Sequence, residues 1–127
     1  MTSAAEVPQT DSDAGPVTLI NVFEIGSDEV ELFLAEWRKR AEFMTKQPGF
    51  RSLKLHRALM PDARFQLVNV AEWDSAEALH AATAQQSFQE GAHRLMQEVK
   101  VTPHPAIYRV ALEVAAPELS EQPQNQT

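Results

Sequence analysis

Two segments of the chain, residues 17–25 and 63–73, have the composition of β-strands and carry large apolar side chains on both faces. Successive side chains of a strand point to opposite faces of a sheet. The apolar residues fall on one face at Leu19, Phe23, Ile25, Phe65, Leu67, Ala71 and Trp73, and on the other at Ile20, Val22, Val68 and Val70. A sheet that contains both segments therefore needs an apolar cover on each side.

The remaining segments supply two helical regions and two further strands. The predicted elements, in chain order, are a strand at 17–25, a helix capped by Ser27 that runs to Met44, strands at 50–60 and 63–73, a helical region at 75–100 broken near Gln85, and a strand at 106–114. Pro48 favours an end to the first helix, and Asp74 with Glu77 forms a capping-box pattern before the second. Pro103 and Pro105 predict an extended connection to the last strand.

The order βαββαβ is typical of an α+β, ferredoxin-like fold, a four-stranded antiparallel sheet with its helices on one face. Two helices leave the other face open, and an exposed apolar patch of that size usually marks an interface. We therefore predict a homodimer that buries Ile20, Val22, Val68 and Val70.

Composition excludes several classes of function. The 127 residues include no cysteine, which excludes disulfides, thiolate catalysis and cysteine-ligated metals. The net charge of −7 is a poor basis for nucleic-acid binding, and no apolar run is long enough to span a membrane. We expect one cytoplasmic domain at 17–114 between disordered tails at 1–16 and 115–127, which are polar, acidic and without a signal-peptide pattern.

Asn21 and Asn69 interrupt two otherwise apolar stripes, and Trp73 ends the second stripe. The two strands are neighbours at the centre of a ferredoxin-like sheet, so both amides could point beneath the helices. A buried amide without a partner costs about 1–3 kcal/mol. Either the amides satisfy each other or a nearby carbonyl, or they line a pocket and bind a ligand oxygen, with the small Ala71 leaving room between Asn69 and Trp73.

The histidines give weaker signals. His93 lies near the edge of a helical stripe, which favours a boundary residue over a ligand, and His104 could border a pocket mouth. His56 and His80 are expected to face solvent, as is the basic run 38–40 on the first helix. No pair of histidines has the spacing of a helical metal site.

The segments Val17–Ile25, Gln47-Pro48-Gly49-Phe50, Leu55-His56-Arg57 and Val68-Asn69-Val70-Ala71-Glu72-Trp73 resemble the antibiotic biosynthesis monooxygenase family. The resemblance covers residues 17–114 and implies a dimeric α+β barrel. Within the family it is similar to the cofactor-independent, quinone-forming monooxygenases of aromatic polyketide pathways, of the nogalamycin-pathway type. Those enzymes oxidise anthrone-type aromatics with O2 and no metal, flavin or haem.

By this resemblance, Asn21, Asn69 and Trp73 are the catalytic residues, the amides stabilising oxyanion charge and the indole N–H donating to a substrate or peroxide oxygen. A related actinorhodin-pathway enzyme has a tyrosine at the position of Leu79, so a tyrosine-assisted mechanism is not expected here. The expected substrate pocket is lined by Phe23, Phe33, Trp37, Leu67, Ala71, Leu79 and His93.

Two alternatives stay open. Haem-degrading members use an asparagine, matched by Asn21, and a tryptophan, whose position is Ala82 here. Their axial histidine lies about one residue out of register with His93. The other alternative is a non-catalytic dimer that binds small hydrophobic ligands.

Overall fold

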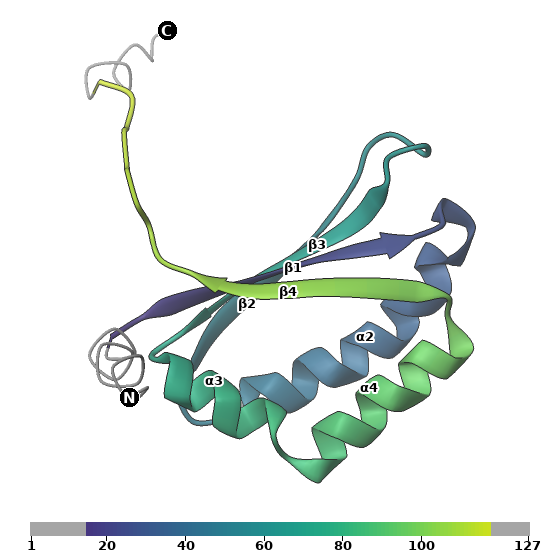
Figure 1. The fold of residues 1–127 in the computed structure, drawn as a ribbon, viewed down its shortest axis with the longest axis horizontal. Coiled ribbons are helices and arrows are strands. Elements are labelled where there is room, and N and C mark those ends of the chain that lie inside the picture. Colours follow the sequence, from purple (N-terminus) through teal and green to yellow (C-terminus); the bar gives the residue numbers. More distant parts are fainter. Residues whose placement is uncertain (1–14, 118–127) are drawn as a thin grey trace, which may run out of the picture.

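The computed structural model describes residues 15–117 and contains one four-stranded sheet with helices packed against it (Figure 1). The elements are β1 (Val17–Ile25), the 3-10 turn η1 (Ser27–Glu29), α2 (Val30–Thr45), β2 (Phe50–Arg57), β3 (Phe65–Trp73), α3 (Ala76–Thr83), α4 (Gln86–Glu98) and β4 (Val101–Tyr108). The strand order is β2-β3-β1-β4, and every neighbouring pair is antiparallel. This arrangement confirms the ferredoxin-like α+β fold.

All three α-helices lie on the same side of the sheet (Figure 1). We call this side the inner face and the opposite side the outer face. The inner face carries two clusters of buried apolar residues. One consists of Phe23, Ile25, Val30, Phe33, Leu67, Leu95, Val99 and Val101, and the other of Val17, Ala71, Trp73, Ala76, Leu79 and Ala82. Asn21 on β1 and Asn69 on β3 lie between the two clusters along their strands.

The turn that joins α2 to β2 depends on Gly49. Its φ is +86°, a conformation that disfavours any residue with a Cβ. A Cβ at this position would lie 2.5 Å from the Cβ of Ala78 on α3, and the Gly49 carbonyl accepts a 2.7 Å hydrogen bond from the Asp74 amide. The end of α2 and the start of α3 are therefore held close together through this glycine.

The N-cap of α3 is Ser75 and not Asp74, which corrects the predicted capping box. The Ser75 hydroxyl accepts a 3.1 Å hydrogen bond from the Ala78 amide. The Asp74 carboxylate is instead paired with Arg51 on β2. The opposite charge of the arginine gives this carboxylate a partner outside the helix.

The last strand differs most from the prediction. β4 spans Val101–Tyr108 and includes both prolines, whereas the sequence predicted a strand at 106–114. β4 lies at the edge of the sheet, where a strand tolerates proline because half of its N–H groups face away from the sheet. The prolines therefore belong to the strand and not to a connection before it.

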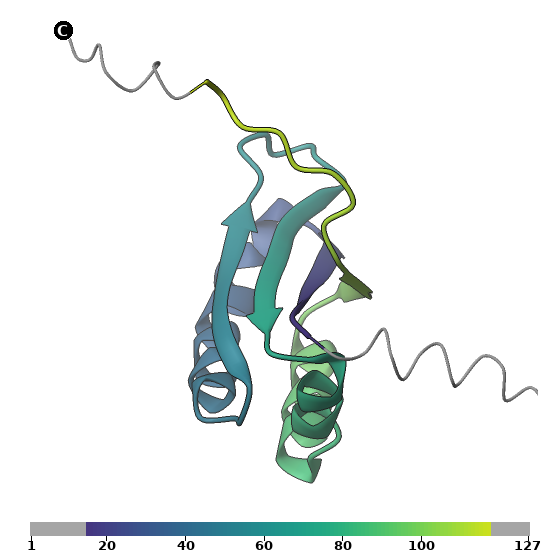
Figure 2. The ribbon, with the colours of Figure 1, turned by 90° about the vertical axis from the view of Figure 1, so that its left-hand side faces the viewer.

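Beyond Tyr108 the chain leaves the sheet. Val110, Leu112 and Val114 are 76%, 83% and 83% exposed, and the part of the predicted strand at 106–114 that follows Tyr108 is wrong. Figures 1 and 2 show the segment leaving on the side of the sheet away from the helices. Its apolar residues alternate as in a strand, but no strand within residues 15–117 pairs with it.

A change of register in β3 moves Phe65 to the outer face. Phe23 pairs with Leu67, but the next residue, Glu24, pairs with Phe65, so one residue of β3 is skipped. The sequence placed Phe65 and Leu67 on one face, and the bulge corrects this. The ring of Phe65 instead meets that of His104 edge-on, with centroids 5.8 Å apart.

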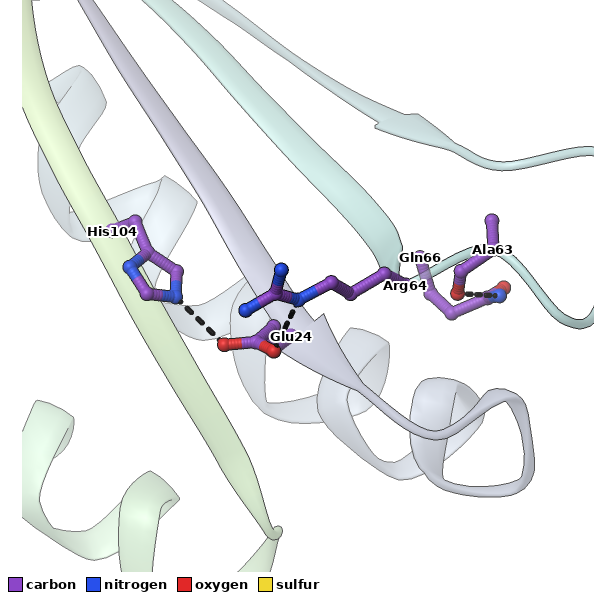
Figure 3. Close-up of polar contacts among 5 residues, drawn as sticks. All are labelled: Glu24, Ala63, Arg64, Gln66 and His104. Carbon is purple, nitrogen blue, oxygen red and sulfur yellow. Dashed lines mark hydrogen bonds and ion pairs between the residues drawn. The ribbon is translucent and has the colours of Figure 1, made fainter.

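The skipped residue is Gln66, which is 2% exposed. Its Nε2 donates to the carbonyls of Met60, Pro61 and Ala63 at 3.1, 3.0 and 2.7 Å (Figure 3 shows the Ala63 contact). One buried side chain therefore organises the turn between β2 and β3.

The predicted tails lie mainly outside the described residues. Of the 1–16 and 115–127 segments the structure describes 15–16 and 115–117, all exposed. Within residues 15–117, no helix is both long and apolar enough to span a membrane.

Candidate functional site

A cavity of about 510 Å³ lies between the inner face of the sheet and the helices. Its volume is in the range of pockets that bury a small organic ligand. The sheet contributes residues from all four strands, and α2, α3 and α4 supply the other walls. Most of the lining is apolar, which leaves the few polar groups as the features that could orient a ligand.

Asn21 and Asn69 form a directly opposed pair on the neighbouring strands β1 and β3. Both line the cavity. The Oδ1 of Asn21 accepts a 3.0 Å hydrogen bond from the His104 amide, which leaves its NH₂ group as the donor it can offer to a ligand. Asn69 is 4% exposed, and its Oδ1 has no partner among the described residues. The amides therefore do not satisfy each other through the Asn69 oxygen.

Trp73 lies on the same face of β3 as Asn69, with Ala71 between them. The side chain is 1% exposed, and its ring meets that of Phe50 edge-on at 5.3 Å. The indole Nε1 has no hydrogen-bond partner among the described residues. Two cavity residues on the same face of β3 thus each keep a buried polar atom unpaired within the described residues, although each such atom costs about 1–3 kcal/mol.

Three packed aromatic rings line the cavity where β1 meets α2. Phe23 lies 5.0 Å from Phe33 and 5.7 Å from Trp37 between ring centroids, and Phe33 stacks on Trp37 at 5.5 Å. The Nε1 of Trp37 is also buried without a partner in residues 15–117. These rings give the cavity an aromatic wall, and aromatic rings pack favourably against an aromatic ligand.

Arg40 on α2 also lines the cavity, although the sequence placed the basic run 38–40 on the solvated side of its helix. Its guanidinium lies 4.5 Å from the Phe88 ring centroid and 5.8 Å from that of Trp37. Burial lowers the pKa of Arg40 below its usual value. Spacing could have identified it, because residues 33, 37 and 40 fall at helical steps of four and three on one face.

Five of the seven expected pocket residues line the cavity: Phe23, Phe33, Trp37, Ala71 and Leu79. The other two do not. Leu67 is fully buried in the neighbouring apolar cluster. His93 is exposed, and its ring nitrogen lies 3.1 Å from the side-chain amide of Gln97. The α4 wall is formed instead by Phe88, Ala92, Leu95 and Met96.

His80, expected to face solvent, is exposed and also lines the cavity. Pro103 and Pro105 line it from β4. The sequence offered no signal for these prolines, because it did not place them in a strand.

His104 lies between these prolines and points to the outer face, not to a pocket mouth. Its Nε2 is 2.9 Å from one carboxylate oxygen of Glu24, and Arg64 binds the other at 2.6 Å (Figure 3). The pKa of Glu24 is lowered below its ordinary value, mainly by the hydrogen bond from Arg64 and next by the hydrogen bond from His104. This exposed cluster is separated from the cavity by the sheet.

The residues present do not fit the haem alternative in the form that the resemblance suggested. His93 faces solvent and does not line the cavity, and Ala82 occupies the position of the tryptophan. Residues 15–117 contain no group of three or more histidine, aspartate or glutamate side chains placed to hold a metal ion.

An antiparallel sheet with helices on one face, and an apolar cavity beneath the helices that contains unpaired amide and indole groups, defines a ferredoxin-like domain with an internal pocket. The chain belongs to the antibiotic biosynthesis monooxygenase family, whose model matches residues 16–94. The match includes β1, β2 and β3 and therefore Asn21, Asn69 and Trp73.

Two solved structures are similar along most of the chain. A protein from Shewanella loihica PV-4, described provisionally as a monooxygenase, is 34% identical, with a TM-score of 0.66 over 79% of this chain and 98% of that one. SnoaB, a cofactor-independent oxygenase from Streptomyces nogalater, is 26% identical, with a TM-score of 0.67 over 81% of this chain and all of that one. No curated protein matches the chain.

Proposed function

We propose that the protein is a cofactor-independent monooxygenase that oxidises a phenolic or anthrone-like aromatic with O2 to a quinone. The observation that carries the proposal is the pair of unpartnered polar atoms, Asn69 Oδ1 and Trp73 Nε1, in one apolar cavity of about 510 Å³. Similarity to SnoaB, itself a cofactor-independent oxygenase, supports the same reaction class.

The proposed reaction converts the methylene of an anthrone to a carbonyl. Two C–H bonds break, one oxygen atom of O2 becomes the new carbonyl oxygen, and the other leaves as water with the two hydrogens. The substrate loses four electrons and O2 gains them. The electron-rich carbanion of the deprotonated anthrone reduces O2 directly, so the protein has to stabilise negative charge on oxygen and exclude water.

Asn21 and Asn69 are proposed to hold the substrate oxygen on which this charge develops. The NH₂ group of Asn21 is oriented by the bond that its Oδ1 accepts from the His104 amide. The Asn69 oxygen has no partner in the described part of the chain, so that amide is free to rotate its NH₂ toward the oxyanion. Trp73 would donate its N–H to a peroxide oxygen. No carboxylate lines the cavity within residues 15–117, so the proton passes to His80 or to solvent.

We also propose that the protein acts as a homodimer joined through the outer face. The chain offers no helix to cover this face within the described residues, and Ile20, Val22, Val68 and Val70 are only half-buried there. The segment after Tyr108, which carries exposed apolar residues, leaves the sheet on the same side (Figures 1 and 2). A second copy would cover both surfaces.

The test is incubation of the protein with 1,8-dihydroxyanthrone in air and under nitrogen, with a metal chelator present and heat-denatured protein as the control for autoxidation. We expect one mole of O2 to be consumed for each mole of quinone formed, in air only. The rate should be well above that of the denatured control. Binding of the anthrone without acceleration of its oxidation would instead favour the non-catalytic ligand-binding alternative.

A further inference from the structure

Arg40 carries a charge at the helix side of the cavity with no counter-ion in the described structure. Its Nε and one terminal nitrogen, Nη1, are buried and have no hydrogen-bond partner within residues 15–117. No ion pair joins Arg40 to an acidic residue in this part of the chain, whereas Arg51, Arg57 and Arg64 each bind a carboxylate. Because arginine stays protonated in proteins, these are unpaired donors of a positive group.

The packing around Arg40 holds its side chain between α2 and α4. The Phe88 ring from α4 and the Trp37 ring from α2 contact the guanidinium. Gly91 on α4 provides room, because a Cβ at that position would lie 3.2 Å from Nη1. The rings stabilise the cation by contact with their faces but accept none of its in-plane N–H groups.

The surroundings of Arg40 are rich in positive charge. It also lines a smaller recess of about 150 Å³, together with Lys39, Arg94 and Glu36. Glu36 is the single acid of this recess in the described structure, and it lies 3.7 Å from Lys39. The three cations of this recess outnumber its one carboxylate, which is paired with Lys39, and the Nε and Nη1 donors of Arg40 are unused within residues 15–117.

We propose that the aromatic ligand of the cavity carries a carboxylate, and that Arg40 binds it as the specificity-determining residue. The planar guanidinium offers two parallel N–H groups that match a carboxylate, and a charge-assisted bond in a dry site is stronger than one in water. The ligand thus extends from the amides of Asn21 and Asn69 on the sheet to Arg40 on the helix side. This inference rests on the proposed function for the location of the ligand, but not for its oxidation.

The test compares two probes that differ in charge, anthraquinone-2-carboxylate and anthraquinone-2-carboxamide. Their dissociation constants are measured by calorimetry for the native protein and for Arg40→Gln, Arg40→Lys and Arg38→Gln. We expect the native protein to bind the carboxylate about 10- to 100-fold more tightly than the amide, the range for a hydrogen bond to a charged group. Arg40→Gln should abolish this preference and Arg40→Lys should retain part of it.

Arg38→Gln is the matched control, because Arg38 lies on the same helix but is exposed and does not line the cavity. It should keep the full preference. If Arg40→Gln does not fold, Arg40→Lys and the native protein still decide the matter, because they differ only at the charged group. Equal binding of the two probes by the native protein, or an unchanged preference in Arg40→Gln, would overturn the proposal.

These results are independent of the proposed oxidation. A carboxylate preference that depends on Arg40, in a protein that does not accelerate anthrone oxidation, supports this inference and contradicts the oxygenase. Rapid oxidation of a neutral anthrone, together with no carboxylate preference, supports the oxygenase and contradicts this inference.

Discussion

On the inner face of the sheet, Asn69 and Trp73 are buried with polar atoms that have no partner among the described residues, whereas on the outer face the half-buried Glu24 is bonded to the exposed Arg64 and His104. The burial of the apolar residues also differs between the two faces. Those of the inner face are packed beneath the helices, and those of the outer face are half-buried.

The contrast favours different roles for the two faces. Folding alone would favour partners for buried polar groups, because an unpaired one is destabilising. Unpaired atoms on the inner face are therefore consistent with a ligand that completes their hydrogen bonds. On the outer face the cluster of Glu24, Arg64 and His104 is paired, and the half-buried apolar residues have no helix over them within residues 15–117, as expected of a protein interface.

The largest effect is expected from Asn69→Ala, which removes an inner-face amide. We expect turnover to fall by about 10²–10³, the usual loss for one donor to an oxyanion. The melting temperature should hardly change, because the Asn69 oxygen has no partner to lose among the described residues. The measurements are quinone formation and thermal unfolding on the same samples.

Trp73→Phe is a second variant of the site, which removes one N–H and keeps most of the apolar volume. It should lower the rate more than the stability. A double variant with alanine at residues 21 and 69 that retains full activity would refute the assigned site. A loss of stability of about 1–3 kcal/mol in Asn69→Ala would instead indicate a structural amide.

The next effect is expected on the outer face, from Val70→Asp. A buried carboxylate without a partner is strongly unfavourable, so this change should convert the proposed dimer to monomer at micromolar concentration. Sedimentation should give a mass near that of one chain, 14.2 kDa, in place of twice that value. Leu32→Asp, a similar change at an exposed position on α2, should leave the dimer intact. A native protein that sediments as a monomer would contradict the proposed interface.

A smaller effect is expected at the start of α3, which covers part of the inner face. Ser75→Ala removes the hydroxyl that accepts from the Ala78 amide and should destabilise the fold by about 0.5–2 kcal/mol. Asp74→Ala should cost less, because Asp74 forms only an exposed ion pair with Arg51. Chemical denaturation of both variants measures the difference, and a larger loss in Asp74→Ala would restore Asp74 as the cap.

The smallest effect is expected from Glu24→Gln on the outer face. Because Arg64 and His104 lower the pKa of Glu24 in the folded protein, the ionised carboxylate stabilises the fold above its ordinary pKa, near 4.5. This contribution is lost as the pH falls through the lowered value. Native protein should therefore be slightly more stable than the variant at pH 7, and the two should converge once the pH has fallen below the lowered pKa of Glu24. A difference that grows in acid would contradict the pairing.

Much of the fold could be predicted from the sequence because period-two and helical patterns are local. They located β1 and the break between α3 and α4, and they singled out Asn21, Asn69 and Trp73 as exceptions on apolar stripes. Where a neighbour in space decides the structure, the same patterns failed. The prolines of β4 were read as a connection because only the sheet order shows that this strand lies at an edge.

The residues that were missed depend on contacts distant in the chain. Gln66 is buried because a bulge turns it toward three carbonyls of the preceding turn. Arg40 lies in a basic run that resembles a solvated surface, and only the approach of α4 at Gly91 encloses it. His93 was expected to line the cavity, but α4 presents Ala92 and Met96 there instead.

The two prolines of β4 also limit how copies of this protein can aggregate. The His104 amide points toward β1, so the backbone nitrogens of residues 103 and 105 point to the open edge of the sheet. Both are proline, and this edge therefore lacks donors at two successive outward positions. An incoming strand from another molecule could not continue the ladder there. The edge that closes the cavity thus also protects the protein from growing into fibrils along that side.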